Sequence, residues 1–303
     1  MKAILKVSEP LLISYGQTIF LQVLALVLIA AGLALVLLGC LLRRRTHTAV
    51  GKTAFNGIAA VSLLGDRSNQ QDFFLFPQGE KHPQGRLAVV CDGMGGLSAG
   101  EQASRICAQK IFSGFYSCAS QTNVCELLKE LAEEADMEVS GLKDANGNLL
   151  RCGTTLVAAV VKDGKAYWVS VGDSRIYLYQ KGRMIQLTRD HNLRMNLESR
   201  LAAGLITREQ MEAVPKQEAL TSFIGKGREL LIDTGELEFT GEDGSLLLLC
   251  SDGLYKSLSD KKILELIQAN SKNVERLPEI IANTALRTGT RKHDNTTVLV
   301  IGR

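Results

Sequence analysis

The sequence predicts an α+β domain with largely antiparallel sheets, preceded by one transmembrane helix. Strand-like segments gather towards both ends of the domain, and paired helical segments lie between them, which is typical of α+β layers rather than of a βαβ repeat. Asp163-Gly164 separates two of the strand-like segments and predicts a tight antiparallel hairpin. A long uncharged run near the N-terminus predicts the membrane helix.

Apolar and β-branched runs predict the strands. Leu87–Cys91 and Leu246–Cys250 are almost wholly apolar, as expected of strands that are covered on both faces. The predicted strands lie near residues 58–63, 72–76, 86–91, 154–161, 165–171, 175–180, 246–250 and 296–301.

Helical periodicity predicts the other elements. Between residues 122 and 140, apolar side chains recur on one stripe and glutamates take the opposite face. Thr207 and Gln210 have the spacing of a capping box. The predicted helices lie at 98–114, 122–140, 194–203, 207–213, 259–269 and 276–288.

Residues 19–42 carry no charge and one strongly polar side chain, Gln22. As a helix they would be about 36 Å long, enough to cross a hydrocarbon core of about 30 Å. The run is longer than the apolar region of a signal peptide. It ends at Arg43-Arg44-Arg45, which outweighs Lys2 and Lys6. The positive-inside rule therefore predicts that the residues after the span lie in the cytoplasm.

The predicted organisation is a short extracytoplasmic N-terminus (1–18), a transmembrane helix (19–42) in contact with the lipid bilayer, a basic stop and linker (43–55), and one catalytic domain (56–303). The predicted location is the cell membrane, single-pass, with the domain in the cytoplasm. The seven cysteines are scattered and form no CxxC pair. This spacing favours a reducing compartment over a disulfide framework.

Composition excludes several classes of protein. With 46% hydrophobic and 22% charged residues among 303, the chain is neither disordered nor fibrous. Five of the 35 basic and one of the 32 acidic residues precede Thr46, so residues 46–303 carry 30 basic and 31 acidic residues. This balance gives no electrostatic basis for binding nucleic acid.

Aspartates recur at the ends of predicted strands. Asp92, Asp173 and Asp252 each follow an apolar strand, whereas Asp72 and Asp294 each open one. Any one of them alone is most simply a turn residue. Together they would repel one another if they converged, unless hard divalent cations such as Mg²⁺ or Mn²⁺ were bound between them.

The order of these motifs resembles the metal-dependent Ser/Thr protein phosphatases of type 2C, specifically their bacterial members. The resemblance spans Asn56 to Arg303. It is carried by Gly65-Asp66-Arg67-Ser68-Asn69-Gln70-Gln71-Asp72, Val90-Cys91-Asp92-Gly93-Met94-Gly95-Gly96, Gly153-Thr154-Thr155, Val171-Gly172-Asp173-Ser174-Arg175, Leu187-Thr188-Arg189-Asp190-His191, Leu220-Thr221-Ser222-Phe223-Ile224-Gly225, Cys250-Ser251-Asp252-Gly253-Leu254 and Asp294-Asn295-Thr296-Thr297.

The resemblance implies a β-sandwich of two antiparallel sheets flanked by helix pairs, with two Mg²⁺ or Mn²⁺ ions at one end. It implies that Asp92 bridges the ions and that the Gly93 carbonyl completes the coordination of one. Asp252 and Asp294 would bind the other ion, and Asp72 would act through coordinated water. A third, weaker ion would lie near Asp173, which would share it with Asp252.

The chemistry implied is phosphate-ester hydrolysis. Two neighbouring cations lower the pKa of a bridging water enough to supply hydroxide. This hydroxide would attack phosphorus while Arg67 binds the phosphoryl oxygens through its planar donors. Asp92 and Arg67 are therefore the predicted catalytic residues. The general acid is unassigned, because Met94 stands where eukaryotic members often have histidine, and His191 has either a structural or a direct role.

The predicted function is a membrane-anchored phosphatase that acts on phospho-Ser and phospho-Thr in cytoplasmic proteins and opposes a bacterial Ser/Thr kinase. One alternative is a pseudophosphatase that binds phosphoproteins without turnover, against which the complete set of acids argues. Another is a phosphatase dedicated to a partner-switching regulator. Cys91 and Cys250 lie in apolar runs without a phosphate-cradling loop, so they are expected in the core and not as nucleophiles.

Overall fold

The computed structural model describes residues 49–302, except residues 56, 80–81, 97–98, 119–122 and 289–291. The predicted N-terminal segment 1–18, the predicted transmembrane helix 19–42 and the start of the predicted linker lie outside the described residues. Within the described part, no helix is both long and apolar enough to span a bilayer.

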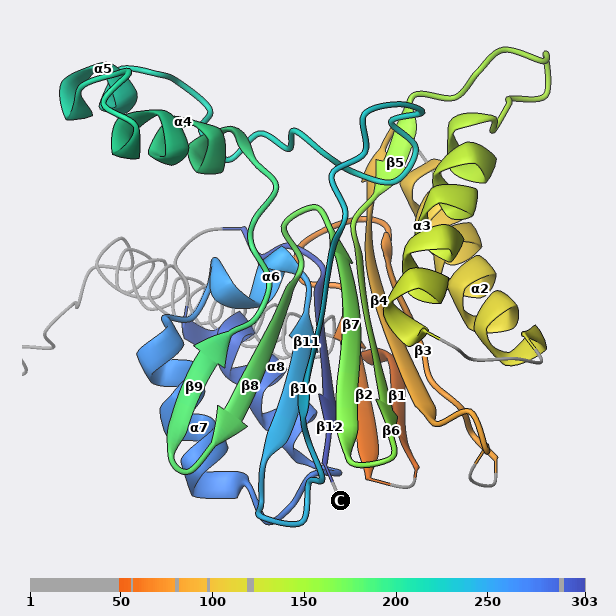
Figure 1. Ribbon diagram of the computed structural model, residues 1–303, viewed down its shortest axis with the longest axis vertical. Coiled ribbons are helices and arrows are strands. Elements are labelled where there is room, and N and C mark those ends of the chain that lie inside the picture. The colour runs from red at the N-terminus through yellow and green to blue at the C-terminus, as the bar shows by residue number, and fades with distance from the viewer. Residues whose placement is uncertain are drawn as a thin grey trace, which may run out of the picture. The chain divides into compact units, whose positions relative to one another are not determined.

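Two six-stranded sheets form the centre of the domain (Figure 1), and all strand pairs in them are antiparallel. The first has the order β1-β2-β12-β11-β8-β9, formed by Ala49–Phe55, Ile58–Leu63, Thr296–Ile301, Leu246–Cys250, Arg175–Gln180 and Arg183–Gln186. The second has the order β10-β7-β6-β4-β3, formed by Asp233–Glu238, Lys165–Val171, Leu156–Lys162, Arg86–Gly95 and Asp72–Leu75, with β5 (Cys152–Thr154) beside β4.

Helices cover the outer face of each sheet. On the second sheet lie α2 (Ala99–Ser117) and α3 (Val124–Ser140), and on the first lie α6 (Asp252–Tyr255), α7 (Asp260–Asn270) and α8 (Leu277–Thr288). Figure 1 shows α2 and α3 beside β4, and α7 beside β8 and β9. The predicted α+β fold with two antiparallel sheets flanked by helices is therefore confirmed.

Residues 87–91 of strand β4 are all apolar because both faces of this part of the strand are covered. Leu87, Val89 and Cys91 pack against α2 and α3. Ala88 and Val90 point the other way, into the core between the sheets. Because successive side chains of a strand face opposite sides, a strand between a helix layer and a second sheet needs apolar residues at every position.

Two sequence-based boundaries change, and two further strands appear. Residues 49–55, assigned to the linker, form β1, which pairs with β2 at the edge of the first sheet. Lys52, Thr53 and Ala54 are exposed, so this edge strand lacks an apolar signature. Strand β4 does not end at Cys91 but continues to Gly95 and pairs with β5. Asp92 consequently lies inside a strand rather than beyond its end. Strands β9 and β10 were also not predicted.

A helical hairpin projects away from the sheets (Figure 1). It consists of α4 (Leu193–Ala202) and α5 (Arg208–Glu212), and the predicted capping box at Thr207 and Gln210 begins α5. Two backbone hydrogen bonds close its base: Leu193 N–H donates to Ala219 O at 2.9 Å, and Arg194 N–H donates to Gln217 O at 2.8 Å. We call residues 193–220 the flap.

Candidate metal centre

The five predicted acids lie at one end of the sandwich. Asp72 opens β3 directly opposite Asp92 of β4. Asp173 lies in the β7–β8 turn, Asp252 opens α6, and Asp294 precedes β12. Burial raises the pKa of Asp92 well above its ordinary value, and the negative charges of the other four acids raise it further. The charges of the other four acids therefore reach Asp92, as a convergent site requires.

Asp72 lies at the base of this acidic group. Ser251 Oγ donates a 2.7 Å hydrogen bond to Asp72 Oδ2 and accepts one from the Thr297 N–H at 2.9 Å. The other oxygen, Oδ1, is buried and receives no hydrogen bond from any described residue. Burial raises the pKa of Asp72 to about 7. A buried carboxylate oxygen without a donor suits an ion or its coordinated water.

A buried polar network fixes the backbone around Asp92. Its N–H donates to Thr155 Oγ1 at 3.0 Å, and its carbonyl accepts from Thr155 N–H and Thr154 Oγ1, both at 2.9 Å. Thr155 Oγ1 lies 2.7 Å from Ser174 Oγ, in the turn that carries Asp173. The predicted motif Gly153-Thr154-Thr155 therefore connects the backbone of Asp92 to the turn that carries Asp173.

Glycine is required at position 93 because there is no room for a side chain, and not because of its backbone angles. A β-carbon at this position would lie 2.0 Å from Gly100 O and 2.7 Å from Gln71 O. The Gly93 N–H donates to Gln71 O at 3.0 Å. Any larger residue would push the start of α2 and the residue before Asp72 away from β4, and the predicted carbonyl ligand would move with them.

The Arg67 loop is held against the residues before β12. The Asp66 N–H donates to His293 O, and the His293 N–H donates to Asp66 Oδ2, each at 2.9 Å. Gln71 N–H donates to Asn295 Oδ1 at 2.8 Å. Arg67 Nη2 donates to Asp294 Oδ2 at 2.6 Å, and this contact raises the pKa of the guanidinium. Arg67 is half exposed at the rim of the acids, where it can meet a ligand.

Two of the acids are paired with basic side chains of the chain itself. Asp294 pairs with Arg67, and Asp252 pairs with Lys256, four residues further along α6. In the described part of the chain, no three histidine, cysteine or carboxylate groups are arranged around a single ion position. The structure therefore gathers the predicted acids but shows them partly engaged with Arg67 and Lys256. Lys256 and Ser251 were not predicted; the i, i+4 spacing of Asp252 and Lys256 is the signal that identifies Lys256 once α6 is located.

His191 has a structural position. It is fully buried, its Nδ1 accepts the Gly172 N–H at 3.2 Å, and its Nε2 lies 3.2 Å from Asp233 Oδ2. Burial lowers its pKa despite Asp233. Its carbonyl accepts from the Thr221 N–H at 2.8 Å, so it joins the base of the flap to the Asp173 turn. Cys91 and Cys250 are buried with raised pKa values, so their predicted core role is confirmed.

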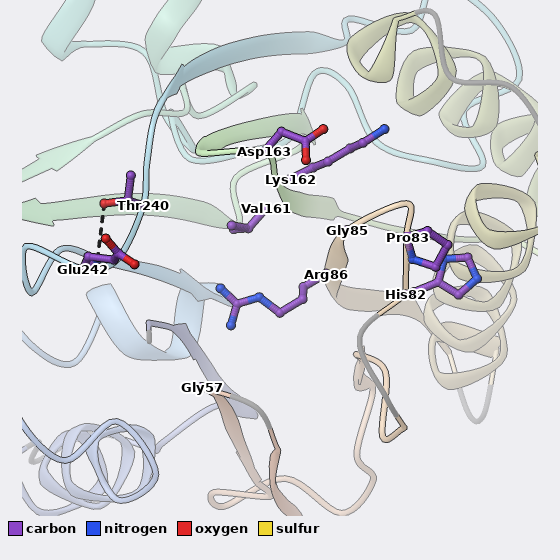
Figure 2. Close-up of a pocket in the computed structure, with 10 residues that line it drawn as sticks. All are labelled: Gly57, His82, Pro83, Gly85, Arg86, Val161, Lys162, Asp163, Thr240 and Glu242. Atoms are coloured by element: carbon purple, nitrogen blue, oxygen red, sulfur yellow. Dashed lines mark hydrogen bonds between the residues drawn. The ribbon is translucent and has the colours of Figure 1, made fainter.

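Pockets occur at both ends of the sandwich. Beside Asp72, a pocket of about 250 Å³ is lined by Gly51, Ser62, Gln70, Asp72, Phe73, Phe74, Glu101 and Arg105. At the opposite strand ends, a pocket of about 650 Å³ is lined by residues of mixed charge, among them Arg86, Lys162, Asp163 and Glu242. Figure 2 shows the Arg86 side chain extending into this second pocket, which contains none of the predicted site residues.

The chain is similar to known protein phosphatases. The family model "Protein phosphatase 2C" matches residues 62–288. Serine/threonine phosphatase stp of Listeria innocua is 30% identical over 238 residues, covering 78% of this chain and 90% of the relative. Protein phosphatase PhpP of Streptococcus pneumoniae is 31% identical over 217 residues, covering 69% and 85%.

A solved structure shares the architecture. The catalytic domain of the serine/threonine protein phosphatase PstP, in complex with two manganese ions, matches with a TM-score of 0.63 and 28% identity, covering 80% of this chain and 96% of that one. Because the family match covers most of the chain, including strands of both sheets and four of the five acids, the chain belongs to the protein phosphatase 2C family, whose members are Ser/Thr phosphatases that use Mn²⁺ or Mg²⁺.

Proposed function

We propose that this chain is a membrane-anchored phosphatase that removes phosphate from phospho-Ser and phospho-Thr of cytoplasmic proteins and opposes a Ser/Thr kinase. The observation that supports the catalytic part is the convergence of five carboxylates at one end of the sandwich, where the charges of the other four act on Asp92. Such a group needs divalent cations to be stable and gains its chemistry from them.

The residues present suit two ions. Asp92, on which the charges of the other four acids act, would bridge the two ions, and the Gly93 carbonyl would complete the coordination of one. Asp252 and Asp294 would hold the second ion once Lys256 and Arg67 turn aside, and the unpartnered Oδ1 of Asp72 would accept a coordinated water. A third ion would lie between Asp173 and Asp252. When bound, the ions supply an activated water and neutralise phosphoryl charge.

Arg67 would bind the phosphoryl group. Its guanidinium is at the rim of the acids, half exposed, and the raised pKa keeps it charged. A guanidinium offers parallel donors that match two phosphoryl oxygens. The Asp66–His293 hydrogen bonds fix the loop that carries Arg67, so the donors would keep their position when Arg67 exchanges Asp294 for substrate.

The anchor proposal depends on the sequence before the domain. Residues 19–42 are uncharged and are followed by three arginines, which favours a single span with the domain on the cytoplasmic side. Phosphoproteins made by ATP-dependent kinases are on that side. Protease added outside intact spheroplasts should leave residues 49–303 undigested; digestion of the domain from outside would overturn this orientation.

Turnover of a phosphothreonine peptide tests the catalytic proposal directly. The purified full chain should release phosphate with Mn²⁺ or Mg²⁺, stop in excess EDTA and recover when Mn²⁺ is restored in excess. Undiminished turnover in EDTA would contradict a divalent-cation mechanism. Binding of the phosphopeptide without any release of phosphate under all metal conditions would favour the pseudophosphatase alternative.

A further inference from the structure

Helix α6 places Lys256 beside the acids. Asp252 is the first residue of this short helix, and Lys256 immediately follows its last residue. Because positions four apart lie on the same face of a helix, Lys256 is directed back towards Asp252. Its Nζ forms an ion pair with Asp252 Oδ2. The lysine side chain keeps 47% of its surface exposed, whereas the Asp252 side chain keeps 16%.

The charge of Lys256 also reaches the neighbouring acids. Burial lowers the pKa of Lys256, but the charges of Asp252, Asp173 and Asp92 raise it and prevail. Burial and the charge of Asp252 raise the pKa of Asp173 to about 6, while Lys256 and a hydrogen bond from Tyr255 oppose this rise.

Arg67 provides an internal comparison. It pairs with Asp294 at the other side of the acids and is also half exposed. Its loop is fixed by hydrogen bonds to residues 293–295, and its planar head suits a phosphoryl group. An ammonium on a flexible stem is a mobile point charge. Lys256 can therefore pair with Asp252 and can also leave it.

We propose that Lys256 is a resident counter-cation of Asp252, and that it competes with the divalent cation that Asp252 would share with Asp173. With Lys256 in place, the acids repel one another less when no metal is bound. The cost is weaker binding of a cation at this position, because the cation must displace the ammonium or approach it closely. This inference rests on the proposed function, in which the acids hold divalent cations.

Calorimetric titration of the metal-free full chain with Mn²⁺ tests the inference without measuring activity. Lys256→Met should tighten the weakest Mn²⁺ binding step about tenfold, since a like charge leaves the site. The same variant should lower the Tm of the metal-free protein at low salt, and Mn²⁺ should remove this difference. Lys256→Arg should retain wild-type values for both. Lys262→Met is the matched control, because this half-exposed lysine pairs with Glu265 on α7.

The outcomes separate the possible roles. Unchanged Mn²⁺ affinity in Lys256→Met would overturn the inference. An increase in the KM for phosphopeptide without any change in Mn²⁺ binding would also overturn it and would identify Lys256 as a substrate contact. If Lys256→Met tightens Mn²⁺ binding but the wild-type chain releases no phosphate, the inference stands and the proposed function fails. If the wild-type chain releases phosphate but its Mn²⁺ binding is insensitive to Lys256, the proposed function stands and the inference fails.

Discussion

The two ends of the sandwich are built from the same strands but are held together differently. At the acidic end, hydrogen bonds join segments far apart in the chain, such as Ser251 with Asp72 and Asp66 with His293. At the opposite end, short hairpins close locally. Asp163-Gly164 joins β6 to β7, and Lys181-Gly182 joins β8 to β9. All four of these turn residues have positive φ angles.

The charges of the two ends differ as well. The acidic end collects carboxylates whose pKa values are raised by burial and by one another. The far pocket mixes Arg86 and Lys162 with Asp163 and Glu242. A cluster of carboxylates that is only partly compensated by Arg67 and Lys256 is costly to stability and is typical of a functional site. Substitutions at the acidic end should therefore change activity, whereas those at the hairpin end should change only local stability.

Asp92→Asn should have the largest effect. It removes the carboxylate at the centre of the acids while its backbone contacts to Thr155 remain possible, so kcat should fall roughly 10³-fold, about 4 kcal/mol of barrier. Steady-state kinetics with a phosphothreonine peptide measures this. Asp163→Asn at the hairpin end is the matched control and should leave kcat unchanged. Retention of more than about a tenth of wild-type kcat by Asp92→Asn would rule out the bridging role.

Arg67→Ala should lower kcat/KM by roughly 10- to 100-fold, because charge-assisted bidentate hydrogen bonds to the phosphoryl group are lost. Calorimetry should find Mn²⁺ affinity nearly unchanged. Arg183→Ala, on exposed β9 at the other end, is the control. A large loss of Mn²⁺ affinity in Arg67→Ala would show instead that Arg67 supports the Asp294 side of the acids.

The stability of the metal-free protein should depend on pH through Asp72. Burial raises its pKa from 3.8 to about 7. Between these values the folded chain holds a proton that the unfolded chain releases, so the free energy of unfolding should fall as pH rises from about 4 to about 7 and then level off. Urea unfolding in EDTA measures this slope. Asp72→Asn should make this slope shallower but not abolish it, because the raised pKa values of Asp92 and Asp173 act in the same direction. An equally steep slope in that variant would assign it to other groups.

Gly164→Ala should have the smallest effect. Gly164 has a φ of 77°, in the left-handed region that disfavours a β-carbon by about 1 kcal/mol or slightly more. Urea unfolding should detect a loss of this size, and kcat should be unchanged. A measurable loss of kcat would mean that the two ends are coupled through the strands.

The sequence predicted the fold where strands are covered on both faces. Leu87–Cys91 and Leu246–Cys250 are apolar because each is between a helix layer and the other sheet. The missed strands are at sheet edges. In β10, Gly235 replaces a large inward side chain because the Trp168 ring fills its place: a β-carbon there would be 2.2 Å from that ring. Because the space beside Gly235 is filled by a side chain from a neighbouring strand, the sequence of β10 itself shows no alternation of apolar and polar residues that would predict a strand.

The candidate site also has a part that the sequence predicted and a part that it did not. The order of the motifs predicted all five acids, and the structure gathers them at one end of the sandwich. The supporting side chains were not predictable. Ser251 donates a hydrogen bond to Asp72 because β11 and β12 bring the two residues together. Lys256 pairs with Asp252 because α6 begins at Asp252. The individual ligand roles of Asp72, Asp92, Gly93, Asp173, Asp252 and Asp294 remain predictions.

The position of β12 has a consequence for biosynthesis. This strand is inserted between β2 and β11 in the middle of the first sheet, although it is translated after all the other described strands. Until it emerges from the ribosome, β1-β2 and β11-β8-β9 have no strand to join them, and Asp294 is absent from the acids. Nascent or prematurely terminated chains therefore lack both a complete sheet and a complete acidic site, so unregulated phosphatase fragments are not expected from interrupted translation.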